Sequence, residues 1–152
     1  MAKIRITKEF VFDAAHNLPH YDGKCRNIHG HTYKLLVTLI GEPCTDTRSP
    51  KCGMVLDFSD LKQVIKDSVV DKFDHALIVS ADGNFDCLKQ FQEDGKFVEV
   101  PFQPTCENLT AYIAEQLLLK LPANVQLYSV RLYETPTSYS EWVACSSRST
   151  RS

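Results

Sequence analysis

The chain has 152 residues, with 17 Lys and Arg against 19 Asp and Glu, and 43% apolar residues. A net charge of −2 gives no positive field for a polyanion, so we expect no nucleic-acid partner. The opening "MAKIRITKEF" lacks the apolar centre of a secretion signal, and no apolar run approaches the roughly 20 residues that span a bilayer. We therefore expect a cytoplasmic protein without a membrane partner, in which the six cysteines are reduced.

The first third of the chain predicts two strands. Apolar residues alternate over residues 3–13 and again over residues 31–40, as in strands with one buried face. His16 follows just past the end of the first run, and a polar loop joins the two runs into a predicted antiparallel hairpin. The segment 41–53 is rich in Gly, Pro, Thr and Ser, which predicts a turn longer than a tight hairpin needs.

The middle of the chain predicts a first amphipathic helix. Over residues 56–73 the apolar period changes from that of a strand to that of a helix, and Asp57 or Ser59 can cap its start. Residues 81–104 give mixed signals, with a short helical turn followed by a short strand near residues 97–100.

A second helix and two final strands complete the pattern. The helix is predicted within residues 104–122, with Thr105 as its N-cap and Glu107 favourably placed in its first turn. Residues 125–135 and 139–146 then alternate as two strands joined by a short turn.

The order strand, strand, helix, helix, strand, strand predicts an α+β fold with a hairpin at each end. We expect an antiparallel four-stranded sheet with both helices on one face. Residues 1–146 are assigned to a single domain, and residues 147–152 are expected to form a disordered tail. The two edges of such a sheet are hidden most simply when sheets join between subunits, so we expect a homo-oligomer.

Three histidines form the leading candidate site. His29 and His31 stand at positions i and i+2 of an extended backbone, so both imidazoles face one side. His16 becomes the third ligand if the hairpin brings its strand end beside them. Three histidines with an open fourth position are typical of a catalytic zinc, and nitrogen ligands favour zinc over magnesium or calcium. An H-x-H motif is also common by chance, so its spacing alone does not establish a metal site.

Spacing leaves two roles open for Cys25. As a fourth ligand it would close the site and make the zinc structural. Standing off the metal, its thiol would be a base or nucleophile with a pKa lowered by the ion and by Lys24 and Arg26. Asp74 and His75 pair a carboxylate with an imidazole at the end of the first helix, and an ordinary surface pair is the alternative.

Glu134 ends an alternating strand, where a charge that faces the core needs a partner. A carboxylate in this position suits a ligand edge with two parallel N–H donors, such as the guanidine-like edge of a pterin or guanine. The alternative is a strand-end glutamate that faces solvent.

Six segments, taken together, resemble a known enzyme family. They are "FDAAHNLPH", "CRNIHGHTYKL", "VLDFSDLK", "FDHALI", "PTCENLT" and "LYETPTS", spanning residues 4 to about 143. In this order and spacing they resemble the family of 6-pyruvoyltetrahydropterin and 6-carboxytetrahydropterin synthases. The C-x3-H-G-H spacing is similar to that of the 6-carboxytetrahydropterin synthase branch of the queuosine pathway, whereas the animal-type 6-pyruvoyl enzymes place the cysteine further from the H-G-H.

The resemblance implies 7,8-dihydroneopterin triphosphate as substrate, and 6-carboxy-5,6,7,8-tetrahydropterin, acetaldehyde and triphosphate as products. It implies the tunnelling fold (T-fold), assembled as trimers and usually hexamers with sites between subunits. It also implies these roles: zinc ligands His16, His29 and His31; base Cys25 with the proton-handling pair Asp74 and His75; and pterin-binding Glu134, Thr105 and Glu107. We assign Lys24 and Arg26 to the triphosphate, with solvated loop charges as the alternative.

Two other functions stay open at this point. A 6-pyruvoyltetrahydropterin synthase would use the same substrate and zinc but eliminate triphosphate without losing carbon. A noncatalytic zinc-stabilised binding module would use Cys25 as its fourth ligand. The 6-pyruvoyl enzyme forms no acetaldehyde, and the binding module loses zinc when Cys25 is replaced. Product analysis and zinc content therefore distinguish the three possible functions.

Overall fold

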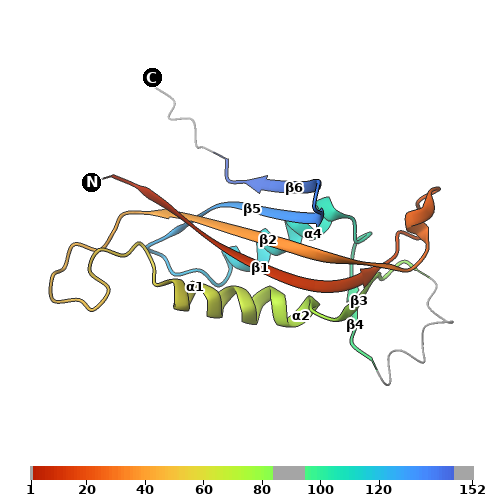
Figure 1. Cartoon of the computed structure of the whole chain (residues 1–152), viewed down its shortest axis with the longest axis horizontal. Coiled ribbons are helices and arrows are strands. Elements are labelled where there is room, and N and C mark those ends of the chain that lie inside the picture. Colours follow the sequence, from red (N-terminus) through yellow and green to blue (C-terminus); the bar gives the residue numbers. More distant parts are fainter. Residues whose placement is uncertain (1, 84–94, 146–152) are drawn as a thin grey trace.

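The computed structural model of the chain describes residues 2–83 and 95–145. These residues form a six-stranded sheet of order β4-β3-β1-β2-β5-β6, with helices packed against it (Figure 1). The strands are β1 (Ile4–His16), β2 (His29–Gly41), β3 (Ala76–Ser80), β4 (Phe97–Val100), β5 (Gln126–Thr135) and β6 (Ser138–Val143). The helical segments are a 3-10 turn (Lys24–Arg26), α1 (Phe58–Ile65), a π-helical turn (Lys66–Val70), α2 (Asp71–Phe73) and α4 (Cys106–Leu118).

The long strands β1 and β2 form the predicted antiparallel hairpin. Their register ends with His16 opposite His29, so both histidines belong to the strands rather than lying just beyond them. Phe12 and Tyr33 are buried on the helix side, whereas Val11 is 63% exposed on the other. Because a slip of one residue would move every apolar side chain to the wrong face, this alternation sets the register.

The expected four-stranded antiparallel sheet is wrong in strand number and in direction. β5 and β6 pair antiparallel as predicted, but β3 pairs parallel with β1, and β4 pairs parallel with β3. Alternation does not reveal β3, because its sequence "ALIVS" is a continuous apolar run, as in a strand covered on both faces. The short strand predicted near residues 97–100 is confirmed as β4. The helical turn predicted after residue 81 and the tail at residues 147–152 lie outside the described residues.

Both helices pack on one face of the sheet, as predicted. Leu61 of α1 and Ile113 of α4 are buried in the same core as Leu35 of β2 and Leu132 of β5. The first helix covers most of its predicted range, because the π-helical turn joins α1 to α2 without a break. Within the described ranges, no helix is both long enough and apolar enough to cross a bilayer.

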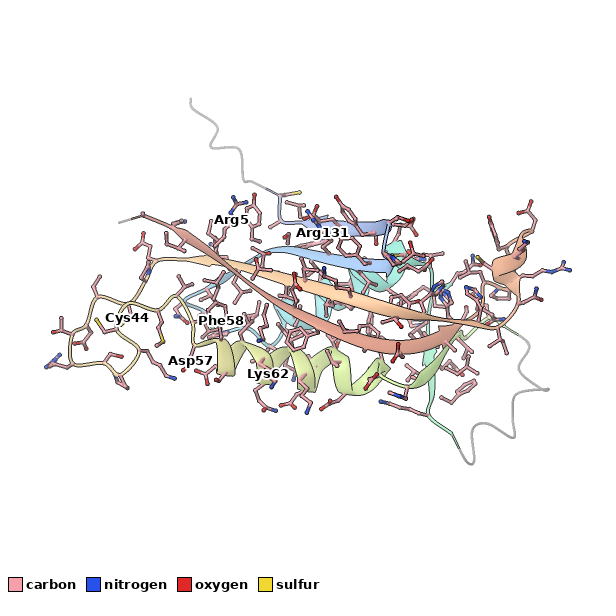
Figure 2. All side chains as sticks on the ribbon, viewed as in Figure 1. Arg5, Cys44, Asp57, Phe58, Lys62 and Arg131 are labelled. Atoms are coloured by element: carbon pink, nitrogen blue, oxygen red, sulfur yellow. The ribbon has the colours of Figure 1, made fainter. Side chains whose placement is uncertain are left out.

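Each helix begins at a predicted N-cap. Asp57 Oδ1, at the start of α1 (Figure 2), accepts a hydrogen bond from the Ser59 amide at 2.8 Å. Thr105 Oγ1 accepts one from the Asn108 amide at 3.1 Å. Lys51 also donates to the Asp57 carboxylate, and this bond, with that from Ser59, holds the pKa of Asp57 below its ordinary value. The start of α1 is therefore fixed by both a cap and an ion pair.

Asp57→Ala is expected to lower the thermal unfolding midpoint by a few degrees, since it removes the cap and the partner of Lys51. Because the folded-state pKa of Asp57 is lowered, its contribution is present above the ordinary carboxylate pKa of 3.8 and is lost as the pH falls below that value. Melting curves of wild type and variant should therefore converge at acid pH. Asp57→Asn is the control, because asparagine keeps the cap and loses the charge. A pH-independent gap for Asp57→Ala would contradict this account.

Candidate functional site

The three predicted metal ligands converge at one end of the hairpin. His16 ends β1 opposite His29, the first residue of β2, and His31 lies two residues further along the same side of β2. One ligand atom of each lies within 4.8 Å of the others. This end of β1 and β2 lies beside β3 and β4, far from the loop that precedes α1 (Figure 1). The strand register thus brings together the three histidines that the sequence singled out.

Backbone carbonyls orient two of the imidazoles. His16 Nδ1 lies 2.8 Å from the Pro104 carbonyl oxygen, and His29 Nδ1 lies 2.7 Å from that of Asn27. A carbonyl oxygen only accepts, so both Nδ1 atoms carry hydrogen and both Nε2 atoms present a lone pair. These two Nε2 atoms are 3.1 Å apart. Two facing lone pairs at this distance repel each other unless a cation lies between them.

His31 supplies the third nitrogen of the set. Its Nε2 is buried and makes no hydrogen bond to any described residue. An ion bound about 2.0–2.1 Å from two imidazole nitrogens at the tetrahedral angle separates them by roughly 3.3 Å. The observed 3.1 Å is close to that spacing. The donor set therefore fits a metal ion that prefers imidazole, with an open position left for water or substrate.

Burial favours the neutral form of two of these imidazoles, those of His16 and His31. His16 is 1% exposed, and burial lowers its pKa to about 4 against the opposing hydrogen bond to Pro104. Burial also lowers the pKa of His31, against the attraction of the Glu134 carboxylate. Neutral imidazole is the form that binds a metal, so these two ligands need lose no proton at neutral pH.

Glu134 of β5 lies beside the histidines. Its Oε1 is 3.8 Å from His31 Nε2, and its side chain is 25% exposed. It lines a cavity of about 330 Å³ together with Thr105 and Glu107, so the three predicted pterin-binding residues share one cavity. It also borders a second cavity, of about 710 Å³, that His31 lines. Glu134 thus stands where a ligand in the smaller cavity would meet the metal site.

Asp74 and His75 follow α2 and form a hydrogen-bonded pair. Asp74 Oδ1 lies 2.9 Å from His75 Nδ1, and 76% of the His75 side chain is exposed. Burial acts to raise the pKa of Asp74, but hydrogen bonds from the Asp13 amide and from His75 outweigh it and lower the pKa. His75 and His31 line one cavity of about 410 Å³. The pair therefore neighbours the metal site without belonging to its ligand set.

Cys25 lies on the 3-10 turn between β1 and β2, flanked by Lys24 and Arg26. It is a free, partly buried thiol, and its sulfur is not among the clustered ligand atoms of the described residues. The Leu18 amide donates to the Cys25 carbonyl at 2.9 Å, which folds the turn back toward the end of β1. Lys24 and Arg26 are exposed and line none of the three cavities around Glu134 and His31. This geometry disfavours Cys25 as a closing fourth ligand.

Several groups around the site carry no sequence signature. The carbonyl oxygens of Pro104 and Asn27 orient imidazoles, and most residue types could supply such an oxygen. Asp13 contacts Asp74 and His75 through its backbone. No local pattern identifies these groups, because the contacts join residues as many as 88 positions apart.

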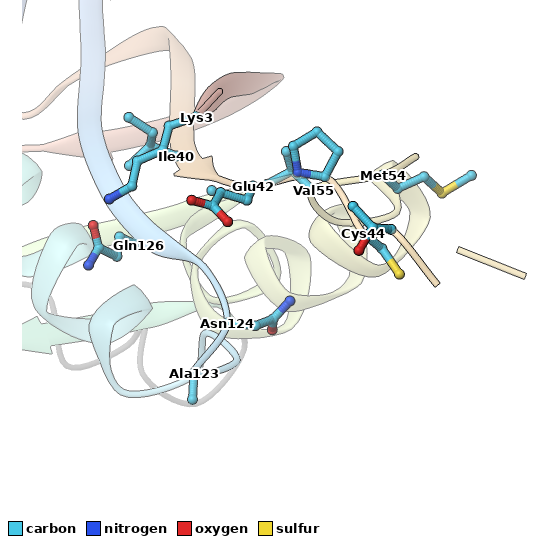
Figure 3. A pocket seen from close by; sticks show the side chains of 12 residues that line it. Lys3, Ile40, Glu42, Cys44, Met54, Val55, Ala123, Asn124 and Gln126 are labelled. Atoms are coloured by element: carbon cyan, nitrogen blue, oxygen red, sulfur yellow. The ribbon is translucent and has the colours of Figure 1, made fainter. Parts of the chain in front are cut away.

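A further cavity, of about 490 Å³, lies at the opposite end of β1 and β2 (Figure 3). Lys3, Glu42 and Gln126 contribute to its lining. Lys3 directly precedes β1 and Glu42 directly follows β2, whereas the histidines occupy the other ends of the two strands. This cavity is therefore no part of the candidate site.

Comparisons with known proteins agree with the fold. The family described as 6-pyruvoyl tetrahydropterin synthase matches residues 5–144. A 6-carboxy-5,6,7,8-tetrahydropterin synthase of Haemophilus influenzae is 41% identical over 142 residues, covering 91% of this chain and 97% of the relative. One from Synechocystis is 37% identical over 134 residues, covering 88% of each. The structure of Caenorhabditis elegans 6-pyruvoyl tetrahydropterin synthase superposes with a TM-score of 0.68 at 28% identity, over 95% of this chain and 98% of that one. The chain therefore belongs to the 6-pyruvoyl tetrahydropterin synthase family.

Proposed function

We propose that the protein converts 7,8-dihydroneopterin triphosphate and water to 6-carboxy-5,6,7,8-tetrahydropterin, acetaldehyde and triphosphate, as a zinc-dependent carbon–carbon lyase of queuosine biosynthesis. The observation that carries the proposal is the convergence of His16, His29 and His31 beside Glu134. Relatives named 6-carboxy-5,6,7,8-tetrahydropterin synthase support this product. The C-x3-H-G-H spacing that begins at Cys25 favours it too.

We assign Glu134 to bind the pterin ring. A carboxylate accepts two parallel hydrogen bonds from a guanidine-like edge, and Thr105 and Glu107 line the same cavity. Thr105 Oγ1 accepts the helix-capping bond, which leaves its hydroxyl hydrogen available to a ligand. With the ring held there, the reactive side chain of the substrate extends toward His31, whose Nε2 is 3.8 Å from Glu134.

The histidines His16, His29 and His31 would hold zinc, whose charge polarises the side-chain hydroxyls of the substrate and eases proton loss from the adjoining carbon. Cys25 is assigned to take that proton, because its sulfur stands outside the ligand cluster and keeps its lone pairs.

Asp74 and His75 supply the second proton-transfer group. The Asp74 carboxylate holds His75 Nδ1–H, so the exposed Nε2 is free to accept or return a proton. Proton movement between ring and side chain prepares triphosphate loss and then cleavage of the carbon–carbon bond. Lys24 and Arg26, both exposed on the turn that carries Cys25, are assigned to offset the charge of the triphosphate.

We also propose that residues 1–146 act as a single domain in a trimer-based homo-oligomer, a hexamer when complete. Within the described residues, β4 and β6 are the two edges of the sheet, and unpaired edges favour strand pairing with another subunit. The exposure of His75 agrees with a site that a neighbouring subunit completes.

Incubation of the zinc-loaded protein with 7,8-dihydroneopterin triphosphate is expected to release acetaldehyde in equal amount to the 6-carboxy pterin. Aldehyde trapping and chromatography of the pterins measure both products. Chelation should abolish turnover and added zinc should restore it, since the facing imidazole lone pairs need a cation. A 6-pyruvoyl product without acetaldehyde would instead assign the sister activity, and no turnover at full zinc occupancy would favour a noncatalytic binding module.

Cys25→Ala is expected to lower kcat by at least about 100-fold, because it removes the proton acceptor. The zinc content and the unfolding temperature should stay at their wild-type values, because the sulfur lies outside the ligand cluster. Steady-state kinetics and metal analysis of the same samples measure these effects. Cys44→Ala, a free cysteine at the opposite end of the sheet, is the matched control and should change neither quantity. Loss of zinc from Cys25→Ala would refute this assignment.

Glu134→Gln is expected to weaken binding of an unreactive pterin by roughly 10- to 100-fold, because the amide turns N–H donors toward a ligand edge that needs acceptors. Fluorescence titration gives the Kd, and metal analysis should show unchanged zinc. Glu141→Gln, on β6 and paired with Arg131 at 3.5 Å, is the control for a lost charge. An unchanged Kd for Glu134→Gln would remove Glu134 from the pterin site.

A further inference from the structure

The backbone at the Asp74–His75 pair adopts a conformation that needs support. His75 has φ of 60°, in the left-handed region, where residues other than glycine persist only when surrounding contacts hold them. The pair also stands at the end of α2, where the last carbonyl oxygens of a helix lack donors within the helix. Two residues from other parts of the chain supply the missing contacts.

Asp13 of β1 is the first. Its carbonyl oxygen accepts a hydrogen bond from the His75 amide at 2.6 Å, and its amide donates to Asp74 Oδ1 at 3.1 Å. The same Oδ1 lies 2.9 Å from His75 Nδ1. Asp74 Oδ1 therefore accepts from two donors, one fixed in the sheet and one on the imidazole, and His75 Nε2 is left as the ring's acceptor.

Lys96 is the second, and it directly precedes β4. Its Nζ donates to the Asp74 carbonyl oxygen at 2.8 Å and also to the Asp71 carbonyl oxygen, so it closes the C-terminal end of α2. Its own backbone is held, because its carbonyl oxygen accepts a hydrogen bond from the Leu77 amide at 2.9 Å. The ammonium group thus reaches the helix end from a fixed point in the sheet.

These contacts meet on one peptide unit. The carbonyl oxygen of Asp74 and the amide hydrogen of His75 belong to the same planar group, since the peptide bond does not rotate freely. Lys96 holds the oxygen of that plane, and Asp13 holds its hydrogen. With both ends held, the plane cannot turn, and the direction in which the His75 imidazole leaves the backbone is set.

We propose that Lys96 is a positioning residue that orients the Asp74–His75 pair for proton transfer. The inference rests on the proposed function of that pair and adds a residue that touches neither substrate nor metal. If Lys96 only capped α2, its removal would lower the stability of the protein without changing the tautomer of the His75 imidazole. Measurements of kcat and of the His75 tautomer therefore distinguish a positioning role from a merely structural one.

Lys96→Met keeps the side-chain length and removes the donor, and it is expected to lower kcat about tenfold with KM and zinc content unchanged. Lys96→Arg should recover most of the rate, because a guanidinium has enough N–H groups for both carbonyl oxygens. Asp57→Ala is the control for lost helix stability, since it removes the cap at the other end of the same helical segment. Lys62→Met, on α1 and turned away from the sheet (Figure 2), is the control for lost charge.

Long-range ¹H–¹⁵N correlation spectra of the imidazoles give a readout that needs no turnover. In wild type His75 should be the Nδ1–H tautomer, and Lys96→Met should shift the population toward Nε2–H. A wild-type kcat and tautomer in Lys96→Met would overturn the proposal, as would an equal loss of kcat in Asp57→Ala. If the wild-type protein does not turn over the substrate, the proposed function fails, whereas the tautomer comparison still decides whether Lys96 orients the pair.

Discussion

The register of the β1–β2 ladder is the constraint on which the candidate site depends. Phe12 and Tyr33 stack at 5.2 Å in the core and set this register from within the ladder. The pairing at the end of the ladder is then fixed, so His16 lies opposite His29, and His31 lies on the same face of the sheet. The stabilisation comes from apolar burial, at about 25 cal/mol per Å². The histidines themselves gain nothing without a cation, since two of their lone pairs face each other at 3.1 Å. The hydrophobic core thus holds two mutually repelling imidazole nitrogens, those of His16 and His29, in the positions that a metal ion needs.

The start of α4 links the candidate metal site to the cavity beside Glu134. The carbonyl oxygen of Pro104 orients His16, and the next residue, Thr105, caps the helix and lines the cavity that holds Glu134. Pro104 and Thr105 are adjacent, and the start of α4 fixes the backbone of both. The His16 imidazole and the wall of the cavity therefore keep a fixed position relative to each other. Glu134 faces the same histidines from β5, at 3.8 Å from His31. The candidate metal site and the cavity beside it are therefore one structural unit, although their residues are far apart in the sequence.

Much of this arrangement follows from local pattern. The H-x-H spacing and the alternation of the first two strands predict the histidine cluster, and side-chain chemistry predicts the caps at Asp57 and Thr105. What local pattern does not predict are contacts made by backbone groups, such as the Pro104 carbonyl 88 residues from His16. Nor does it reveal Lys96, since a lysine beside a strand reads as an ordinary exposed charge. Long-range hydrogen bonds of this kind depend on the fold as a whole, and many residue types satisfy them.

The strand that alternation hides directly follows Asp74 and His75, the proposed proton-transfer pair. β3 begins one residue after His75, and its parallel pairing places Ala76 opposite Ala14 and Ile78 opposite His16. This short ladder joins the end of α2 to the end of β1, where the candidate metal ligands lie. A parallel strand buried on both faces needs a continuous apolar run, which removes the period-two signal. The burial that conceals β3 from the sequence therefore also fixes the strand that places Asp74 and His75 beside the candidate metal site.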